Sequence, residues 1–169
     1  PVARQGRQLQ TLGQPRTATE RRVLSEEEAR RLLDVSLNYR HLMSGCLPTV
    51  VRLGLYAGLR NQEMCWLKWD AIDWKQRIIS IRQTTCAATG RTWVPKDYES
   101  RRLDVKPACL EYLTGERARQ QQAGMLGPFV LPGGDAKRTD YREQPLSDKV
   151  PQNSFAKMIA AEGMDRAIT

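Results

Sequence analysis

The sequence contains few of the residues that bind metals or act as nucleophiles. It holds one histidine, His41, and four cysteines, Cys46, Cys65, Cys86 and Cys109, with no CxxC pair among them. Zinc sites draw their ligands from closely spaced cysteines and histidines, so this spacing argues against one. Nothing around any cysteine indicates an activated thiol. We therefore expect four reduced, mostly buried thiols, no metal and no cofactor.

Long apolar segments are also absent. No run approaches the roughly 20 apolar residues that a membrane-spanning helix needs, and no secretory signal opens the sequence. Together with the unpaired cysteines, this pattern predicts a cytoplasmic protein without a membrane partner. A length of 169 residues allows one domain with a substantial core.

Acidic residues are too few to balance the basic ones. The 27 Lys and Arg against 19 Asp and Glu give a formal net charge of +8 and a sequence pI near 9.6. This excess predicts an anionic partner, with nucleic acid first and an anionic membrane surface a distant second. Charge alone leaves open a soluble basic domain with no polyanionic partner.

The chain divides into an N-terminal arm and one domain. Residues 1–22 are rich in Gln, Arg and Thr and show no periodic apolar pattern, which predicts a flexible basic arm or linker. That arm either contacts DNA or is a solvated tail. Ser25 and Glu28 have the spacing of a capping box, so the folded domain, residues 23–169, opens with a helix there.

The remaining pattern predicts a mainly α, α+β domain with a small three-stranded antiparallel sheet. Further helices are expected at Leu47–Tyr56, Asn61–Trp69, Pro107–Gln122 and Ser154–Glu162, the last capped by Asn153. Strands are expected near Arg77–Gln83, Thr92–Pro95 and Arg102–Val105, because β-branched residues and a change of period mark them. Pro132–Gln152 is expected to be a long polar loop that is either mobile or functional.

One stretch is more informative than any other: Gly58-Leu-Arg60-Asn-Gln-Glu63, followed by Leu67-Lys-Trp-Asp-Ala-Ile-Asp73. An apolar helix ends at Gly58 and another opens after Arg60. A turn of this kind holds Arg60 on rigid backbone at a helix start, beside free N–H groups, where its guanidinium can bind a phosphate through two hydrogen bonds.

This stretch resembles the first arginine motif of the tyrosine recombinases, the phage-integrase family of DNA strand-exchange enzymes. In that family the motif is roughly Gly-Leu-Arg-x-x-Glu, followed by Leu-x-Trp-x-Asp-Ile-Asp. A second stretch, Pro-Lys96-Asp-Tyr-Glu-Ser-Arg101-Arg102-Leu-Asp-Val105, is similar to the family's Pro-Lys-x-x-x-Ser-Arg-x-Val-Pro hairpin.

The resemblance implies a role for each of five residues. Arg60 is one of two arginines that clamp the scissile phosphate, and Lys96, on a hairpin tip, donates a proton to the leaving 5′ oxygen. Glu63 supports Arg60 or the helix start. Arg101 and Arg102 are DNA-binding residues that contact backbone phosphates, with surface charge as the alternative. Each role has an alternative without function. Arg60 and Glu63 could form an ordinary surface ion pair, and Lys96 could be an exposed hairpin lysine with no role.

The family pattern continues with a His-x-x-Arg helix and a late nucleophilic tyrosine. No His-x-x-Arg follows Lys96, and His41 lies upstream of Arg60. Tyr112 and Tyr141, the tyrosines beyond the hairpin, lack the family's context, so we assign no nucleophile. The resemblance then implies the N-terminal two-thirds of an integrase-type catalytic domain, inactive by itself.

The expected function is that of a fragment of a site-specific DNA recombinase, which cuts and rejoins DNA through a phosphotyrosine intermediate. Its expected partners are double-stranded DNA and other recombinase protomers, and its expected location is the cytoplasm, on the nucleoid. Two alternatives stay open: a non-catalytic DNA-binding module or remnant, and a basic helical domain that binds protein or RNA.

Overall fold

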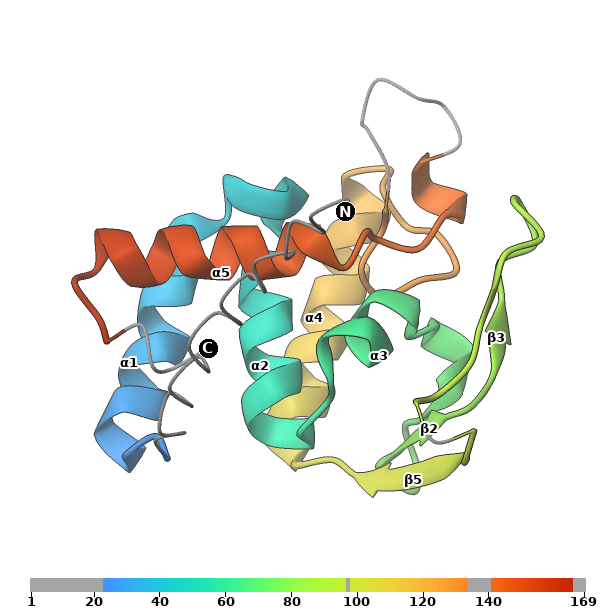
Figure 1. The fold of residues 1–169 in the computed structure, drawn as a ribbon, viewed down its shortest axis with the longest axis horizontal. Coiled ribbons are helices and arrows are strands. Elements are labelled where there is room, and N and C mark those ends of the chain that lie inside the picture. The colour runs from blue at the N-terminus through green and yellow to red at the C-terminus, as the bar shows by residue number, and fades with distance from the viewer. Residues whose placement is uncertain (1–22, 97, 134–140, 166–169) are drawn as a thin grey trace, which may run out of the picture.

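Helix α2 (Leu47–Ala57) lies at the centre of the domain, with the other helices around it. The computed structural model describes residues 23–96, 98–133 and 141–165, so the arm expected at residues 1–22 lies outside the described residues. In Figure 1, α5 (Lys149–Ala161) crosses over α1 (Glu26–Ser36) and α2, and α4 (Pro107–Gln122) lies behind α2. The short helix α3 (Asn61–Trp66) stands between α2 and the strands.

The predicted capping box of Ser25 and Glu28 is present at the start of α1. The Ser25 backbone N–H donates to Glu28 Oε2 at 2.9 Å, and the Glu28 N–H donates to Ser25 Oγ at 3.2 Å. These reciprocal bonds satisfy two N–H groups that a helix start would otherwise leave without a partner. The capping box therefore fixes where α1 begins.

Helix α2 agrees with the prediction, including Pro48 in its first turn and Gly58 at its C-cap. Gly58 has φ +60°, a left-handed conformation that glycine adopts without a Cβ penalty. The helix is apolar nearly all round because it serves two clusters of buried side chains. Leu47 and Val51 pack with α1 and α5, whereas Leu53 packs toward α3, α4 and the strands.

Helix α3 is shorter than predicted, since it ends at Trp66 rather than at Trp69. Leu67 is already extended, and its carbonyl accepts the Val130 N–H at 2.9 Å. The Trp69 N–H donates to Pro128 O at 3.0 Å. Pairing with the buried segment 128–130 thus replaces the last helical turn, and a 3₁₀ turn, Trp69–Ala71, follows.

A three-stranded antiparallel sheet is present, but its composition differs from the prediction. Its order is β1 (Ile72–Asp73), β2 (Ile78–Ile81) and β5 (Arg101–Asp104). The expected strand at Thr92–Pro95 is instead β4 (Thr92–Trp93), which pairs with β3 (Thr84–Thr85) in a separate two-stranded ribbon. The third strand of the sheet comes from residues 72–73, which were not among the predicted strands.

The start of α5 is also corrected. The helix begins at Lys149, not at Ser154, so Asn153 lies inside it rather than at its cap. Pro151 fits within the first turn, where a missing N–H costs nothing. The helix shortens the expected loop 132–152, of which residues 134–140 lie outside the described residues. Helix α4 has the bounds that were predicted.

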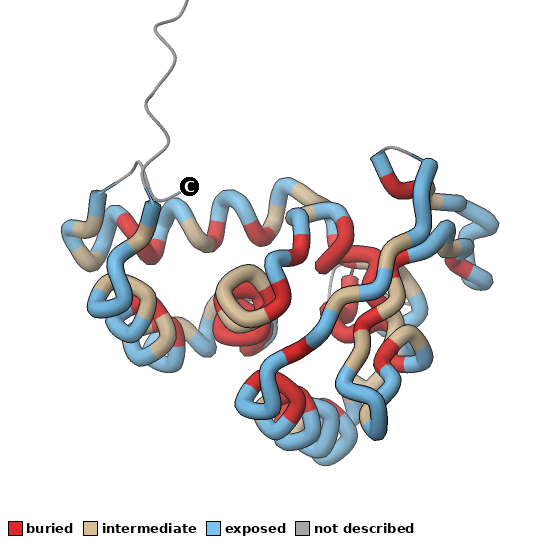
Figure 2. Tube along the Cα trace, turned by 90° about the horizontal axis from the view of Figure 1, so that it is seen from below, coloured by how far each residue is buried: buried red, intermediate tan, exposed pale blue. Residues whose placement is uncertain are grey.

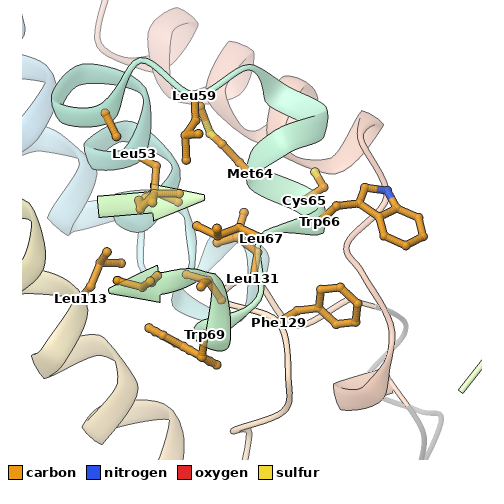
Figure 3. Close-up of a cluster of buried hydrophobic side chains, with 14 of the residues drawn as sticks. Leu53, Leu59, Met64, Cys65, Trp66, Leu67, Trp69, Leu113, Phe129 and Leu131 are labelled. Atoms are coloured by element: carbon orange, nitrogen blue, oxygen red, sulfur yellow. The ribbon is translucent and has the colours of Figure 1, made fainter. Parts of the chain in front are cut away.

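The buried side chains lie where α2, α3, α4 and the sheet face one another. In the tube of Figure 2 the buried positions gather on the inward sides of the elements, and Figure 3 shows Leu53, Met64, Leu67 and Leu131 converging. The ring of Phe129, fully buried, meets Trp66 edge-on with ring centroids 6.1 Å apart. This packing holds the start of α3 rigidly against the sheet.

All four cysteines are free and buried, as predicted. Burial raises the pKa of the Cys46 and Cys65 thiols to about 12 and that of Cys109 to about 11. Within the described residues, no cluster of potential metal ligands occurs and no helix is long and apolar enough to cross a membrane.

We expect these thiols to resist alkylation while the domain is folded. All four side chains are buried away from the reagent. Thiolate is the reactive form, and the raised pKa values of Cys46, Cys65 and Cys109 leave little of it at those three residues at pH 8. Iodoacetamide at pH 8 should label the folded protein far more slowly than free cysteine, and all four residues should react once urea unfolds it. Rapid labelling of the folded chain at a cysteine, mapped by mass spectrometry, would contradict the described packing.

Candidate active site

Arg60 lies in the turn between α2 and α3, as the N-cap of α3, with extended backbone at φ −68° and ψ 153°. Its side chain is 50% exposed. The left-handed Gly58 ends α2, and the buried Leu59 anchors the turn in the core. Arg60 is therefore held on short, fixed backbone with its guanidinium at the surface.

Glu63 lies beneath this turn, and it is almost fully buried, with 2% of its side chain exposed. Its Oε2 accepts the backbone N–H of Arg60 at 2.8 Å. Its Oε1 lies 3.9 Å from Arg60 Nη1. The carboxylate thus bonds to the backbone at the start of α3 and occupies the Arg60 N–H.

Arg101 reaches the same carboxylate from a different part of the fold. It is the first residue of β5, and its Nη2 donates to Glu63 Oε2 at 2.7 Å. Its side chain is 38% exposed. Two arginines that are 41 positions apart in sequence (101 minus 60) therefore meet at one buried anion. A contact of Arg101 with a DNA phosphate stays a prediction, and its ion pair with Glu63 was not predicted.

A second set of bonds joins the same turn of α3 to other elements. The Trp93 indole Nε1, on β4, donates to Gln62 Oε1 at 3.4 Å. The Gln62 amide donates to Asp148 Oδ2 at 3.4 Å, and the Asn61 amide donates to the Asp148 carbonyl at 2.8 Å. The first turn of α3 thus contacts the β3–β4 ribbon, strand β5 and the N-cap of α5.

Lys96 belongs to the segment between these two anchors. It is exposed, in a turn three residues after Trp93 and five before Arg101. A chain spans at most about 3.6 Å per residue, so the Cα of Lys96 lies within roughly 11 Å of that of Trp93. Both ends of the segment bond to the first turn of α3, through Trp93 at one end and Arg101 at the other. Asp97 lies outside the described residues.

Arg102 does not join this group. It follows Arg101 in β5, so the two side chains leave opposite faces of the strand. Arg102 is exposed, and its Nη2 donates to Gln76 Oε1 at 3.0 Å. A DNA contact by Arg102 stays a prediction, and it would lie apart from the group formed by Arg60, Glu63 and Arg101.

A polar cavity of about 370 Å³ lies beside α3, between the ribbon and the segment before α5. Gln62, Trp66, Arg91 and Trp93 line one part of it, and residues 144–148 line the other. The Arg91 guanidinium lies 5.9 Å from the centre of the Trp66 ring. This cavity adds another cation and flat aromatic surface next to the Arg60 turn.

The two tyrosines beyond the hairpin lie elsewhere. Tyr112 is on α4 with the Arg52 guanidinium 4.2 Å from its ring centre, and burial raises its pKa, which disfavours the phenolate. Tyr141 opens the 3₁₀ turn Tyr141–Glu143, with Arg142 5.5 Å from its ring centre. Neither has a described bond to Arg60, Glu63 or Lys96.

No family model matches the sequence, and no curated protein matches it. Solved structures do match the fold. The crystal structure of XerA recombinase aligns with a TM-score of 0.61 and 19% identity, over 92% of this chain and 47% of that one. The Tn1549 transposon integrase bound to circular-intermediate DNA aligns with a TM-score of 0.66 and 13% identity, over 86% of this chain and 46% of that one.

This chain has the fold of a tyrosine recombinase catalytic domain. The same Tn1549 integrase bound to transposon right-end DNA agrees, with a TM-score of 0.62, 13% identity, and 85% and 46% of the two chains aligned. The chain spans about half the length of the structures it matches. At these identities the likeness establishes the tyrosine recombinase fold, and activity is a separate question.

We expect the buried Glu63 to be far more important for stability than an exposed acid in an ion pair. Glu63→Ala should lower the free energy of unfolding by about 3–5 kcal/mol, because it leaves the Arg101 guanidinium and the Arg60 N–H without their acceptor. Urea denaturation measures this loss.

Glu26→Ala is the matched control for this measurement. Glu26 pairs with Arg30 at 2.6 Å, but both side chains are exposed, so its loss should cost about 1 kcal/mol or less. Equal losses for the two variants would show that Glu63 does not hold the turn in the way described.

Proposed function

We propose that this chain is the part of a tyrosine-type, site-specific DNA recombinase that holds the scissile phosphate. Arg60 binds the phosphate, Lys96 acts as the acid for the leaving 5′ oxygen, and Glu63 supports Arg60. Duplex DNA and other recombinase protomers are its partners. The Tn1549 integrase structures that share this fold are complexes with DNA.

One observation supports the proposal above all: the segment that carries Lys96 is bonded at both ends to the helix turn that carries Arg60. Trp93 bonds to Gln62 at one end and Arg101 bonds to Glu63 at the other. These bonds support a site in which two cations from separate motifs, Arg60 and Lys96, face the same side of the domain. A phosphate between them would meet a guanidinium and an ammonium together.

The chemistry suits these two cations. Cleavage of a phosphodiester without a metal needs positive charge on the non-bridging oxygens and a proton for the departing alkoxide. A guanidinium offers a planar fork to the phosphate, and a lysine on a turn brings a compact, flexible ammonium. The attacking tyrosine is not assigned to this chain, so the proposed cleavage belongs to a protein that supplies one.

We expect the chain to bind duplex DNA weakly, with little sequence preference and a steep salt dependence. Phosphate contacts position a protein without reading the sequence. Arg60→Ala should weaken binding by about tenfold and reduce the slope of log K against log salt by about 1, as for one lost phosphate contact. Fluorescence anisotropy with a labelled duplex at several salt concentrations measures both quantities.

Arg30→Ala is the control, because it removes the same charge from the exposed face of α1. It should leave the salt slope unchanged within error. A flat salt slope for the unaltered chain would instead favour a domain that binds protein. An Arg60→Ala slope equal to that of the unaltered chain would refute the phosphate contact.

In a full-length protein that includes this chain, Arg60→Ala should reduce cleavage by about 10²–10³, because the lost charge acts on the transition state. Lys96→Ala should also slow cleavage, and a substrate whose leaving 5′ oxygen is replaced by sulfur should restore its rate, since a thiolate departs without a proton donor.

Arg60→Ala should gain nothing from the sulfur substrate, because its defect lies at the non-bridging oxygens. A nicked duplex scored for a covalent protein–DNA band follows both variants. If sulfur fails to rescue Lys96→Ala, the acid is another group.

A further inference from the structure

The polar cavity beside α3 has a volume of about 370 Å³ and takes no part in the roles proposed above. It lies between the β3–β4 ribbon and the segment before α5, and in Figure 1 the ribbon stands beside α3 on the side away from α1. Pockets that hold small organic molecules have volumes of roughly 300–1,000 Å³. This cavity is at the lower end of that range, which suits a single flat ring system.

Three flat side chains line the cavity: Trp66, Arg91 and Trp93. The Trp66 side chain is 9% exposed, and in Figure 3 its indole extends away from the core residues Leu53 and Leu67. Indole rings and guanidinium planes are the groups on which proteins stack unpaired nucleobases. The cavity therefore offers stacking surface for a base.

The Arg91 guanidinium lies over the Trp66 ring without stacking closely on it. Its central carbon is 5.9 Å from the ring centre, whereas flat groups in contact lie about 3.5–4 Å apart. A base placed between the two needs two such contacts, or about 7 Å in all. Because the Arg91 side chain is exposed, it can move outward by that difference.

The polar groups of the cavity favour a base over a phosphate. Asp148 Oδ2 and the Gln62 amide nitrogen, 3.4 Å apart, belong to its lining, and Thr92 and Ser147 add hydroxyl groups. A carboxylate repels a phosphate at short distance, but it accepts hydrogen bonds from the N–H and amino groups of a base. The cavity thus combines stacking surface with partners for the edge of a base.

We propose that this cavity binds one unpaired nucleobase of the DNA, stacked between Trp66 and Arg91 with its edge toward Asp148. This inference rests on the proposed function. Gln62, in the cavity lining, is two residues after Arg60 in the first turn of α3. An enzyme that cuts one strand and rejoins it to another must unpair nucleotides beside the cut, and the cavity would hold one of them.

The test compares the binding of one sequence as a fully paired duplex, with a single bulged 2-aminopurine, and with a bulged abasic nucleotide, at one salt concentration. We expect the chain to bind the 2-aminopurine bulge about tenfold more tightly than the paired duplex, the usual gain from one base stacked on an aromatic side chain. The fluorescence of 2-aminopurine should fall as it stacks. The abasic bulge has the same backbone without the base, so it should bind like the paired duplex.

Ser147→Phe tests the location of the base. Ser147 is exposed at the cavity, so the added ring fills part of it without changing the charge. This variant should lose the preference for the 2-aminopurine bulge and the fall in fluorescence, and should bind the paired duplex unchanged. Ala88→Phe is the matched control, because it adds the same ring at an exposed position between β3 and β4 that does not line the cavity. It should keep the preference.

Thermal melting shows which variants are folded under the binding conditions. If Ser147→Phe does not fold, Arg91→Ala replaces it, since it removes one side of the stack. The ratio of the affinities for the bulged and paired duplexes should then fall toward one. Using this ratio cancels the general loss of affinity that follows from removing a positive charge.

Two results would overturn the inference while leaving the proposed function intact. Equal affinities for the 2-aminopurine and abasic bulges would show that the chain recognises the backbone and not the base. A preference that folded Ser147→Phe retains would place the base outside the cavity. A chain that fails to bind the paired duplex, or an Arg60→Ala variant that binds it like the unaltered chain, would instead refute the proposed function.

Discussion

The geometry of the candidate site depends on one buried carboxylate. Glu63 accepts the backbone N–H of Arg60 and a guanidinium N–H of Arg101, and so joins the α2–α3 turn to strand β5. A buried charge is tolerated when its partners are close and well oriented, and losing one of them is costly. The same contact thus ties the turn that carries Arg60 to the strand that begins with Arg101.

Buried side chains hold the α2–α3 turn in place. The α2–α3 turn rests on Leu59 and Met64, and the segment after α3 pairs with residues 128–130 instead of continuing as a helix. Gln62 then connects Trp93 on the ribbon to Asp148 at the start of α5. The first turn of α3 is therefore where the helices, the sheet and the ribbon meet, and a site there gains rigidity from each of them.

Local signals in the sequence were sufficient for much of this fold. The capping box at Ser25, the C-cap at Gly58 and the bounds of α4 follow from residues close to one another in the chain. The early end of α3 and the composition of the sheet did not follow, because distant segments decide them.

The same distinction applies to the site. Arg60 and Glu63 lie within one turn, and the resemblance of that short stretch to the recombinase arginine motif drew attention to both. The ion pair of Arg101 with Glu63 and the bond of Trp93 to Gln62 join residues 38 and 31 positions apart, which no local pattern shows. The string Ser100-Arg101-Arg102 drew attention to both arginines equally. Successive side chains of a strand point to opposite faces, so the structure of β5 is needed to show that Arg101 and not Arg102 faces Glu63.

The central claim is that Arg60 and Lys96 contact the same phosphate. Nuclear magnetic resonance of the ¹⁵N-labelled chain, titrated with a short duplex, tests it most directly, because the Arg60 Nε–H and Lys96 Nζ signals can be followed separately. The account predicts that both signals shift with one dissociation constant, and that Arg60→Ala weakens the response of Lys96. It would be contradicted if the two signals titrated with different constants, or if Lys96 responded fully without Arg60.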